Sequence, residues 1–373
     1  MENQTHITVP VNLGDRSYDI LVGHGILDAF GQAFVGRELG NSVAIVTNPT
    51  VAALYLDRVQ NSLEAEGVRV TVVTMPDGEA YKTLETAGEI YGELIRAGLD
   101  RAACVVTLGG GVVGDTAGFV AATYLRGIHF VQGPTTLEAQ VDASVGGKTA
   151  VDHPLGKNMI GAFHQPRLVY IDTETLFSLP AREVSAGMAE VIKHGLIRDP
   201  ELVSFLEEYL EAAVRLEIEP DRLDWLIAQN CRIKARVVEA DETEEGLREI
   251  LNYGHTVGHA VEAVSGFDCK HGEAVCLGML AAGKIALDKG MWGQADFDRQ
   301  EALLFKLGIW RGVEDLRVND ILEWMGRDKK VRDGVIRFVL PERIGHLVSC
   351  DTVTRCEMGA GIQYMQTCSA KGR

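Results

Sequence analysis

The stretch VVTLGGGVVGD (residues 105–115) decides the fold, because it passes from a β-branched run into a helical segment through consecutive glycines. Gly109, Gly111 and Gly114 satisfy the spacing GxGxxG, in which glycines let backbone N–H groups approach a pyrophosphate at a helix N-terminus. The turn follows a third or fourth predicted strand instead of the first, and Asp115 comes directly after it instead of about 20 residues on. The pattern leaves two interpretations open: a dinucleotide site, or a tight strand-to-helix turn that holds no ligand.

Short β-branched runs alternate with helical segments around this turn. The runs lie at residues 43–47, 68–74, 104–108 and 168–171. A good helical segment at 81–98 separates the second run from the third, and this alternation predicts a parallel sheet with helices on its faces. Residues 7–22 predict instead a hairpin around residues 12–15 at the edge of the sheet.

The second half of the chain has a different pattern. Long segments of 3.6-residue periodicity run almost to residue 330. At 221–240 one helical stripe includes Lys234, which therefore lies on the wrong face for a solvated lysine. Residues 332–340 predict a late hairpin, and residues 366–373 a frayed tail. We predict an α/β Rossmann-like domain over residues 1–178, an all-α domain over residues 179–373, and a cleft between them.

Composition narrows the possible partners. The net charge of −17 opposes binding to nucleic acid or acidic membranes, so an anionic ligand must be small and held by basic residues gathered locally. The chain shows no signal-peptide pattern, and no apolar run approaches the roughly 18 residues of a membrane span. Seven scattered cysteines without a CxxC pair indicate reduced thiols. We expect a cytoplasmic protein.

Polar residues follow other predicted strands. Asp77, Gly78 and Glu79, with Lys82 nearby, come after the run at 68–74, where open α/β sheets bind ligands and where carboxylates can meet ribose hydroxyls. Thr135 and Thr136 add hydroxyls at another strand end. These neighbours favour the dinucleotide interpretation.

The loop at 142–158 offers donors for phosphate. Its GGKT resembles the end of a P-loop, but the first glycine of that motif falls on Asp142, so the nucleotide-triphosphate interpretation fails. Lys148, Lys157 and Asn158 remain as suitable donors. The alternative is that these lysines serve only solubility.

Histidines and a carboxylate indicate a metal site. His255, His259 and Glu262 share one helical face, and His271 opens the next helix. An HEXXH zinc motif would need Glu at position 256, where Thr stands. One alternative is that the histidines only form hydrogen bonds at helix ends and bind no metal. Another is that Cys269 and Cys276 act as soft ligands.

A possible carboxylate ligand lies on an apolar segment. Glu190 shares a helical face with Lys193 and His194, and small and apolar residues surround all three. Such a pair three residues apart is often a surface ion pair, but this setting equally suits a buried site. One Glu and two His would hold a zinc-like ion and leave positions open for substrate. Lys193, Lys234 and Arg248 would then hold an anionic substrate in the same cleft.

Six motifs in register resemble the 3-dehydroquinate synthase family of sugar-phosphate cyclases, over roughly residues 15–350. They are DGEAYKTLE (77–85), GGGVVGDTAGFVAATYLRGI (109–128), PTTLEAQVDASVGGKTAVDHPLGKNMIGAFHQP (134–166), GMAEVIKHGLI (187–197), NYGHTVGHAVE (252–262) and HGEAV (271–275). The resemblance implies an NAD-binding α/β domain, a helical domain that binds zinc or cobalt, and a homodimer.

The resemblance also assigns site residues by position. The implied metal ligands are Glu190, His255 and His271. The implied NAD-binding residues are Asp77, Gly78, Glu79, Lys82, Gly111, Val112, Val113, Gly114, Asp115, Thr135, Thr136, Lys148, Lys157, Thr175, Leu176, Phe177 and Ser178. The implied catalytic and substrate residues are Asp142, Lys148, Asn158, Lys193, Lys234, Arg248, Asn252, His259, Lys329 or Lys330, and Arg126 from the partner subunit.

The family's reaction is a phosphate-lyase step of the shikimate pathway, which leads to aromatic amino acids. It converts 3-deoxy-D-arabino-heptulosonate 7-phosphate into 3-dehydroquinate and phosphate, with transient oxidation by NAD, elimination, re-reduction and aldol closure. The resemblance implies that Lys148, Asn158 and Arg126 bind the phosphate and that Lys234 and Arg248 bind the carboxylate. Three positions depart from the family's usual residues, namely Gly133, Glu138 and Asp152, and the two acids add negative charge beside the phosphate loop.

Three alternative functions remain. A sibling cyclase acting on sedoheptulose 7-phosphate or glucose 6-phosphate would share the fold, NAD and the metal, although Lys234 and Arg248 favour an acid substrate. A metal-dependent polyol dehydrogenase would accumulate NADH. A non-catalytic NAD-binding regulator would show no turnover after metal reconstitution, but competent residues fill all three ligand positions.

Overall fold

The computed structural model describes residues 6–266, 268–308, 312–326 and 336–371. The predicted substrate residues Lys329 and Lys330 lie outside these ranges. The chain divides into two compact units, residues 1–179 with 219–239, and residues 180–218 with 240–373. The second segment of the first unit was expected in the helical domain. It contains α8 (Pro220–Ala240), and Lys234 and Cys231 of this helix contact the chain at Asp142 and Gln140.

A seven-stranded sheet forms the centre of the first unit, in the order β1-β2-β9-β6-β5-β3-β4. Its strands are β1 (Ile7–Val11), β2 (Tyr18–Gly23), β3 (Ser42–Thr47), β4 (Arg69–Thr74), β5 (Cys104–Gly109), β6 (His129–Pro134) and β9 (Leu168–Asp172). Only β1 runs antiparallel to its neighbour, as the predicted edge hairpin requires. The other neighbouring strands pair in parallel.

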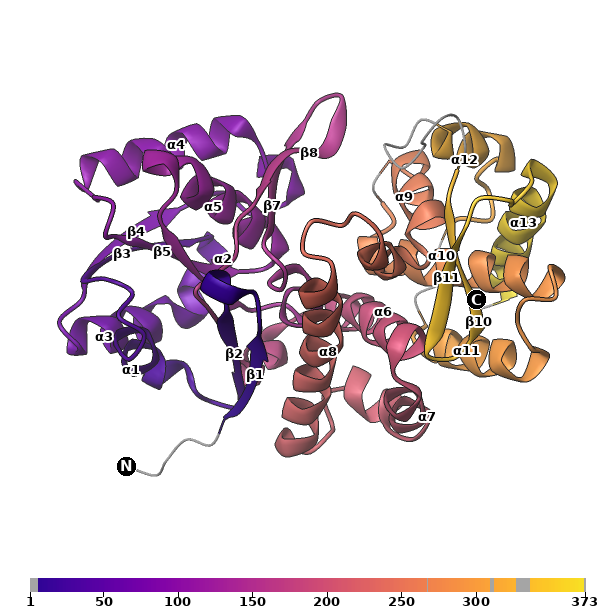
Figure 1. Ribbon diagram of the computed structural model, residues 1–373, viewed down its shortest axis with the longest axis horizontal. Coiled ribbons are helices and arrows are strands. Elements are labelled where there is room, and N and C mark those ends of the chain that lie inside the picture. Colours follow the sequence, from indigo (N-terminus) through magenta and orange to yellow (C-terminus); the bar gives the residue numbers. More distant parts are fainter. Residues whose placement is uncertain (1–5, 267, 309–311, 327–335, 372–373) are drawn as a thin grey trace. The chain divides into compact units, whose positions relative to one another are not determined.

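Helices cover both faces of this sheet (Figure 1). They are α1 (Phe30–Val35), α2 (Pro49–Val51), α3 (Asp57–Ala65), α4 (Leu84–Arg96) and α5 (Gly111–Thr123). Alternate residues of one strand enter different cores, because successive side chains of a strand point to opposite faces. Val46 packs in the core of α4 and α5, whereas Ile45 packs in the core of α1 and α3. The predicted α/β fold of the N-terminal half is confirmed.

The strand order reverses beside β3, which lies between β4 and β5. Ligands of open α/β sheets bind at the carboxyl ends of the strands at such a switch point. The glycine turn at Gly109 and Gly110 follows the carboxyl end of β5, directly beside β3. A separate hairpin of β7 (Lys148–His153) and β8 (Gly156–Phe163) packs against α5 and carries the predicted phosphate donors.

The second unit is mainly helical. Its helices are α6 (Ala181–Arg198), α7 (Pro200–Val214), α9 (His255–Val264), α10 (His271–Asp288), α11 (Gln294–Lys306), α12 (Val318–Met325) and α13 (Arg355–Lys371). Helix α10 contacts α6, α9 and α13, so it forms the centre of the unit. Within the described residues, no helix is both long and apolar enough to cross a membrane.

In the C-terminal region the late hairpin is present with other bounds, and the expectation of a frayed tail was wrong. The late hairpin consists of β10 (Phe338–Arg343) and β11 (His346–Cys350), so it begins near the end of the predicted segment, part of which lies outside the described residues. The expected frayed tail is the end of α13, where Cys368 and Ser369 are buried. The amide of Gln366 donates to the carbonyl oxygens of Val313 and Leu316, a tertiary anchor that has no local sequence signal.

Candidate metal and dinucleotide sites

Three helices bring the predicted metal ligands together in the second unit. Glu190 lies in the middle of α6, His255 begins α9 and His271 begins α10. The helices approach at backbone contact, because a Cβ on Gly272 would lie 2.0 Å from the carbonyl oxygen of Ala186 on α6. Glycine is required next to His271 for this approach.

The ligand atoms of these residues converge. Oε1 of Glu190 lies 3.8 Å from Nε2 of His255 and 3.7 Å from Nε2 of His271. Two ligands of one tetrahedral zinc ion would lie roughly 3.3–3.6 Å apart, given metal–ligand distances of about 2.0–2.2 Å. Glu190 is fully buried, and its Oε1 has no hydrogen-bond partner among the described residues. A buried, unpartnered carboxylate oxygen beside two imidazoles fits a bound cation.

The opposite nitrogens of the two imidazoles have partners. Nδ1 of His271 lies 3.1 Å from a carboxylate oxygen of Glu262, and Nδ1 of His255 lies 3.1 Å from the carbonyl oxygen of Tyr253. Since both partners accept, Nδ1 carries the proton in each ring and Nε2 keeps its lone pair. Carboxylates and carbonyls fix metal-binding histidines in this way. The site can therefore bind a divalent ion with both Nε2 atoms and Glu190.

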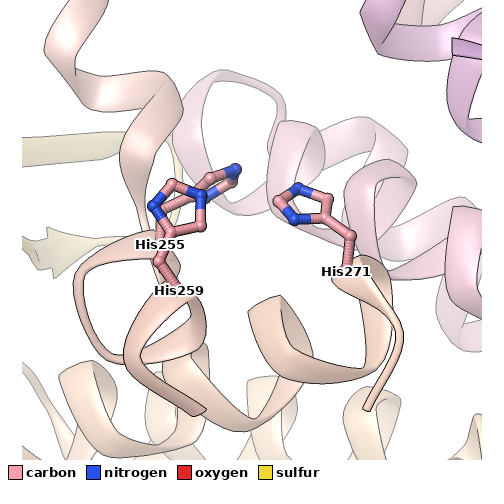
Figure 2. Close-up of side chains that lie close together, drawn as sticks. All are labelled: His255, His259 and His271. Atoms are coloured by element: carbon pink, nitrogen blue, oxygen red, sulfur yellow. The ribbon is translucent and has the colours of Figure 1, made fainter. Parts of the chain in front are cut away.

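His259 completes a cluster of three imidazoles. Figure 2 shows that the side chains of His255, His259 and His271 lie close together. Nitrogen atoms of the three lie within 4.8 Å of one another. The His259 ring is farther from His271 than the His255 ring is, with centroid separations of 5.7 and 5.1 Å. His259 can serve as a ligand or as a proton carrier beside the ion.

Lys193 is buried beside the same carboxylate. Its side chain is 1% exposed, and its ammonium group pairs with Oε2 of Glu190 one helical turn earlier. The predicted face of Glu190, Lys193 and His194 is buried throughout. A buried ammonium group next to a metal ligand can donate a hydrogen bond to a substrate oxygen.

A turn between α8 and η8 (Leu247–Asn252) supports Arg248 and Asn252. The carboxylate of Asp241 accepts from the backbone N–H groups of Glu245, Gly246 and Arg248, at 2.9, 2.8 and 2.9 Å. Burial acts to raise the pKa of Asp241, but these hydrogen bonds outweigh it and hold the pKa below its ordinary value.

Glu244 in this turn was missed by the sequence analysis. It adopts a left-handed backbone with φ of 62°, and its carboxylate accepts from the side-chain amide of Asn252 at 3.1 Å. The Arg248 side chain is 1% exposed and donates to the carbonyl oxygen of Glu242 at 2.6 Å. The acidic run at 241–245 gave no signal for these roles, because such runs are usually solvated.

The first unit gathers the predicted dinucleotide residues at the carboxyl edge of its sheet. Helix α5 begins at Gly111 without a side-chain cap on its first turn, so its first backbone N–H groups are available to an anion. A Cβ on Gly111 would meet only Ala143, at 3.6 Å, whereas Gly110 packs closely on Thr136. The N–H of Thr135 donates to the carbonyl of Gly109 at 3.0 Å. These residues fit a bound pyrophosphate.

Lys82 links this turn to the β7–β8 hairpin. Its ammonium group lies 2.6 Å from the carboxylate of Asp115 and 2.6 Å from the side-chain oxygen of Asn158. Burial opposes the charge on Lys82, but Asp115 and Glu79 outweigh it and raise the pKa of the amine. Lys157 pairs with Glu79 at 3.1 Å. Hydrogen bonds and ion pairs thus connect the predicted dinucleotide residues with the predicted phosphate loop.

Other predicted residues lie farther along the same edge. Thr175, Leu176, Phe177 and Ser178 form a 3-10 turn after β9, η7 (Thr173–Ser178). Gln140 connects this turn to β6, since its amide donates to Thr175 and to the carbonyl of Pro134.

Lys234 lies on the buried stripe of α8, as predicted, and is 6% exposed. Its ammonium group contacts the carboxylate of Asp142 at 2.6 Å. Asp142 lies in a π-helical turn, η6 (Ala139–Ala143), a distortion that is frequent at functional sites.

Two family models match this chain. Residues 72–186 match the N-terminal part of 3-dehydroquinate synthase, and residues 187–331 match its C-terminal part. A 3-dehydroquinate synthase from Nostoc sp. is 48% identical over 96% of this chain and 99% of that protein. One from Pelobacter propionicus is 50% identical over 91% of this chain and 94% of that protein.

The chain belongs to the 3-dehydroquinate synthase family.

Solved structures of related cyclases share this fold. A 2-deoxy-scyllo-inosose synthase complexed with carbaglucose-6-phosphate, NAD+ and Co2+ has a TM-score of 0.86 and 27% identity, covering 96% of this chain and 99% of that one. A 2-epi-5-epi-valiolone synthase from Streptomyces hygroscopicus with NAD+ and Zn2+ bound has a TM-score of 0.86 and 28% identity, covering 95% and 98%. A glycerol dehydrogenase from Schizosaccharomyces pombe is 16% identical with a TM-score of 0.67, and the match covers 95% of this chain and 90% of that one. At this identity the likeness shows the fold alone.

Proposed function

We propose that this member of the 3-dehydroquinate synthase family converts 3-deoxy-D-arabino-heptulosonate 7-phosphate into 3-dehydroquinate and phosphate, with NAD and zinc or cobalt. The observation that carries the proposal is the convergence of Glu190, His255 and His271, together with relatives near 50% identity that bear this name. Seven cysteines without a disulfide fit a reducing compartment, and we place the enzyme in the cytoplasm.

Glu190 and Nε2 of His255 and His271 would hold the ion, since their other atoms already have partners that orient them. Bound to these sites, the ion would polarise a substrate hydroxyl, and NAD would take up a hydride there and return it, so that no net NADH forms. Lys193 would donate a hydrogen bond to a neighbouring substrate oxygen. His259 would carry a proton, and Asn252 would position a hydroxyl.

NAD would lie at the carboxyl edge of the sheet. The first turn of α5 at residues 111–115 would meet the pyrophosphate, while Asp77, Gly78, Glu79 and Lys82 would flank a ribose. The remaining residues assigned to NAD are Thr135, Thr136, Lys148, Lys157, Thr175, Leu176, Phe177 and Ser178. The proposal is supported by the uncapped helix start and by Gly111, where an added Cβ would meet only Ala143, at 3.6 Å.

Basic residues would hold the two anionic ends of the substrate. Arg248 and Lys234, both buried, would bind the carboxylate, and Asp142 would orient Lys234. Lys148 and Asn158 would bind the phosphate, which can itself take the proton that is lost in its elimination. A sugar-phosphate substrate without a carboxylate would lack the group that Arg248 and Lys234 are proposed to bind.

Arg126 would complete the phosphate site from the partner subunit of a homodimer. Leu125 and Arg126 have φ of 49° and 70°, a left-handed pair of non-glycine residues that costs roughly 1–3 kcal/mol per residue. The strained turn leaves Arg126 exposed at the surface of its own subunit. Such strain is common where a side chain must be presented to a ligand or a partner.

Phosphate release tests the substrate. The zinc-loaded enzyme with NAD is mixed separately with 3-deoxy-D-arabino-heptulosonate 7-phosphate, sedoheptulose 7-phosphate and glucose 6-phosphate. We expect release from the sugar acid at least about 100-fold faster than from the others, because only the sugar acid offers a carboxylate to Arg248 and Lys234. Equal or faster release from either neutral sugar would refute this substrate.

A further inference from the structure

The β7–β8 hairpin is irregular opposite Asp152. Pairing passes from Val151 with Ile160 to His153 with Gly156, so residues 157–159 of β8 lie opposite the single residue Asp152 of β7. Its backbone N–H donates to the carbonyl oxygen of Lys82 at 2.7 Å, and Thr83 forms an isolated bridge with it. These extra residues of β8 include Asn158, and Asp152 opposite them ties the hairpin to the segment before α4.

The Asp152 side chain holds the backbone of Asn158. Its Oδ1 accepts from the Asn158 N–H at 2.7 Å. Asn158 has φ of 53°, a left-handed conformation that few non-glycine residues other than Asn and Asp adopt. The hydrogen bond to the carboxylate stabilises this conformation. Asp152, which departs from the residue usual in the family, therefore does more than add charge.

Lys82 fixes the side chain of the same residue. Lys82 is 5% exposed, and its ammonium group donates to Oδ1 of Asn158 at 2.6 Å. Because Oδ1 accepts from Lys82, the amide nitrogen and its two N–H donors point away from the ammonium group. Asn158 is thus held at its backbone by Asp152 and at its carbonyl end by Lys82. Its remaining function is to donate.

We propose that Asp152 is a positioning residue that holds Asn158 ready to donate to the substrate phosphate. The proposal rests on the function proposed above, in which Asn158 binds phosphate. Asp152 itself touches no reacting atom in this account. Without it, Asn158 would leave the left-handed conformation, and its amide would lose the orientation set by Lys82.

Titration calorimetry with inorganic phosphate, on the enzyme loaded with NAD and zinc, tests the proposal without turnover. We expect Asp152→Ala to weaken phosphate binding about tenfold and to raise the KM for the sugar acid phosphate by a similar factor. kcat should change less than about threefold, and the affinity for NAD should fall less than the affinity for phosphate, since the first turn of α5 is untouched. Asp152→Asn keeps a side-chain oxygen and should restore most of the affinity.

Two variants separate positioning from general loosening of the hairpin. His153→Ala removes the neighbouring hydrogen bond from the Leu155 N–H, and it should leave phosphate affinity unchanged. In an Asn158→Gly background the left-handed backbone is free and the amide is gone, so adding Asp152→Ala should have no further effect. An equal loss with His153→Ala, or a further tenfold loss in the Asn158→Gly background, would overturn the proposal.

The two proposals fail in different ways. If wild type releases no phosphate from the sugar acid but binds inorganic phosphate in the Asp152-dependent manner, the proposed substrate is wrong and the positioning role stands. If wild type turns over the substrate and Asp152→Ala binds phosphate as wild type does, the positioning role is wrong. A wild type that binds no phosphate also overturns it.

Discussion

The two ring nitrogens of His271 have different partners. Nδ1 meets Glu262, whereas Nε2 faces the buried oxygen of Glu190 at 3.7 Å. A histidine that only formed a hydrogen bond at the end of a helix would not need its second nitrogen close to a buried carboxylate. This arrangement supports the proposal that His271 shares a cation with Glu190.

His271→Ala should lower the turnover rate at least about a thousandfold, because one of the three proposed metal ligands is lost. NAD affinity should stay within about twofold of wild type, since the dinucleotide residues belong to the other unit. Metal content by mass spectrometry and NAD titration check both parts. Normal activity in the zinc-depleted variant would contradict the ligand assignment.

Glu262 provides a milder test of the same site. Glu262→Gln keeps the shape but removes the charge that orients His271, so zinc affinity should fall about tenfold, and Glu262→Ala should lower it up to about 100-fold. Competition with a chromogenic chelator measures both constants. Zinc affinities equal to wild type in both variants would show that Glu262 does not support the ligand.

Some site residues were predictable from local spacing and others were not. His255, His259 and Glu262 share a helical face, which a single segment reveals. Glu190 required the argument that an ion pair within an apolar segment is buried, and the structure buries it fully. The carbonyl of Tyr253 and the Glu244 contact to Asn252 have no local signal, because both depend on how the chain turns before α9.

At the scale of elements, close helix packing brings the residues of the proposed metal site together. Besides Gly272 against α6, a Cβ on Gly278 would lie 1.9 Å from the carbonyl oxygen of Gly254 before α9. Arg182 on α6 also holds Glu273 on α10 through two hydrogen bonds of 2.6 and 2.7 Å. Small residues at these contacts let three helices present ligands to one point.

Gly272→Ala should therefore separate α6 from α10 and lower zinc affinity at least about tenfold, with a loss of about 1–3 kcal/mol in the free energy of unfolding. Gly359→Ala on α13 is the matched control, since a Cβ there meets nothing within 4 Å and should be neutral or stabilising. Chelator competition and urea unfolding measure the effects. Equal zinc affinity in the two variants would contradict this packing account.

The predictable elements were those with a complete local pattern. The strand ending at Gly109 and the helix after it followed from β-branched residues and glycines. The hairpin β7–β8 was missed, because β8 exposes alternate residues such as Met159 and Phe163 that give no core pattern. The end of α13 was missed for the opposite reason, since its polar sequence is held by tertiary contacts such as that of Gln366.

At the scale of the whole molecule, the homodimer proposal makes a complementation prediction. Arg126→Ala and His271→Ala, each present in both subunits, should strongly lower the activity of the homodimer. A heterodimer of the two variants, purified through two different tags, should regain about half of the wild-type activity, because one of its two sites then has both residues. An inactive heterodimer would show that Arg126 does not act across subunits.

The central claim is that NAD is recycled within each turnover, which separates a cyclase from the dehydrogenases that share this fold. The most direct measurement supplies zinc-loaded enzyme with NAD at about one hundredth of the concentration of 3-deoxy-D-arabino-heptulosonate 7-phosphate and follows 3-dehydroquinate, phosphate and NADH absorbance together. We predict that both products reach the substrate concentration while NADH stays near zero. NADH rising in step with product, or product stopping at the amount of NAD supplied, would contradict the account.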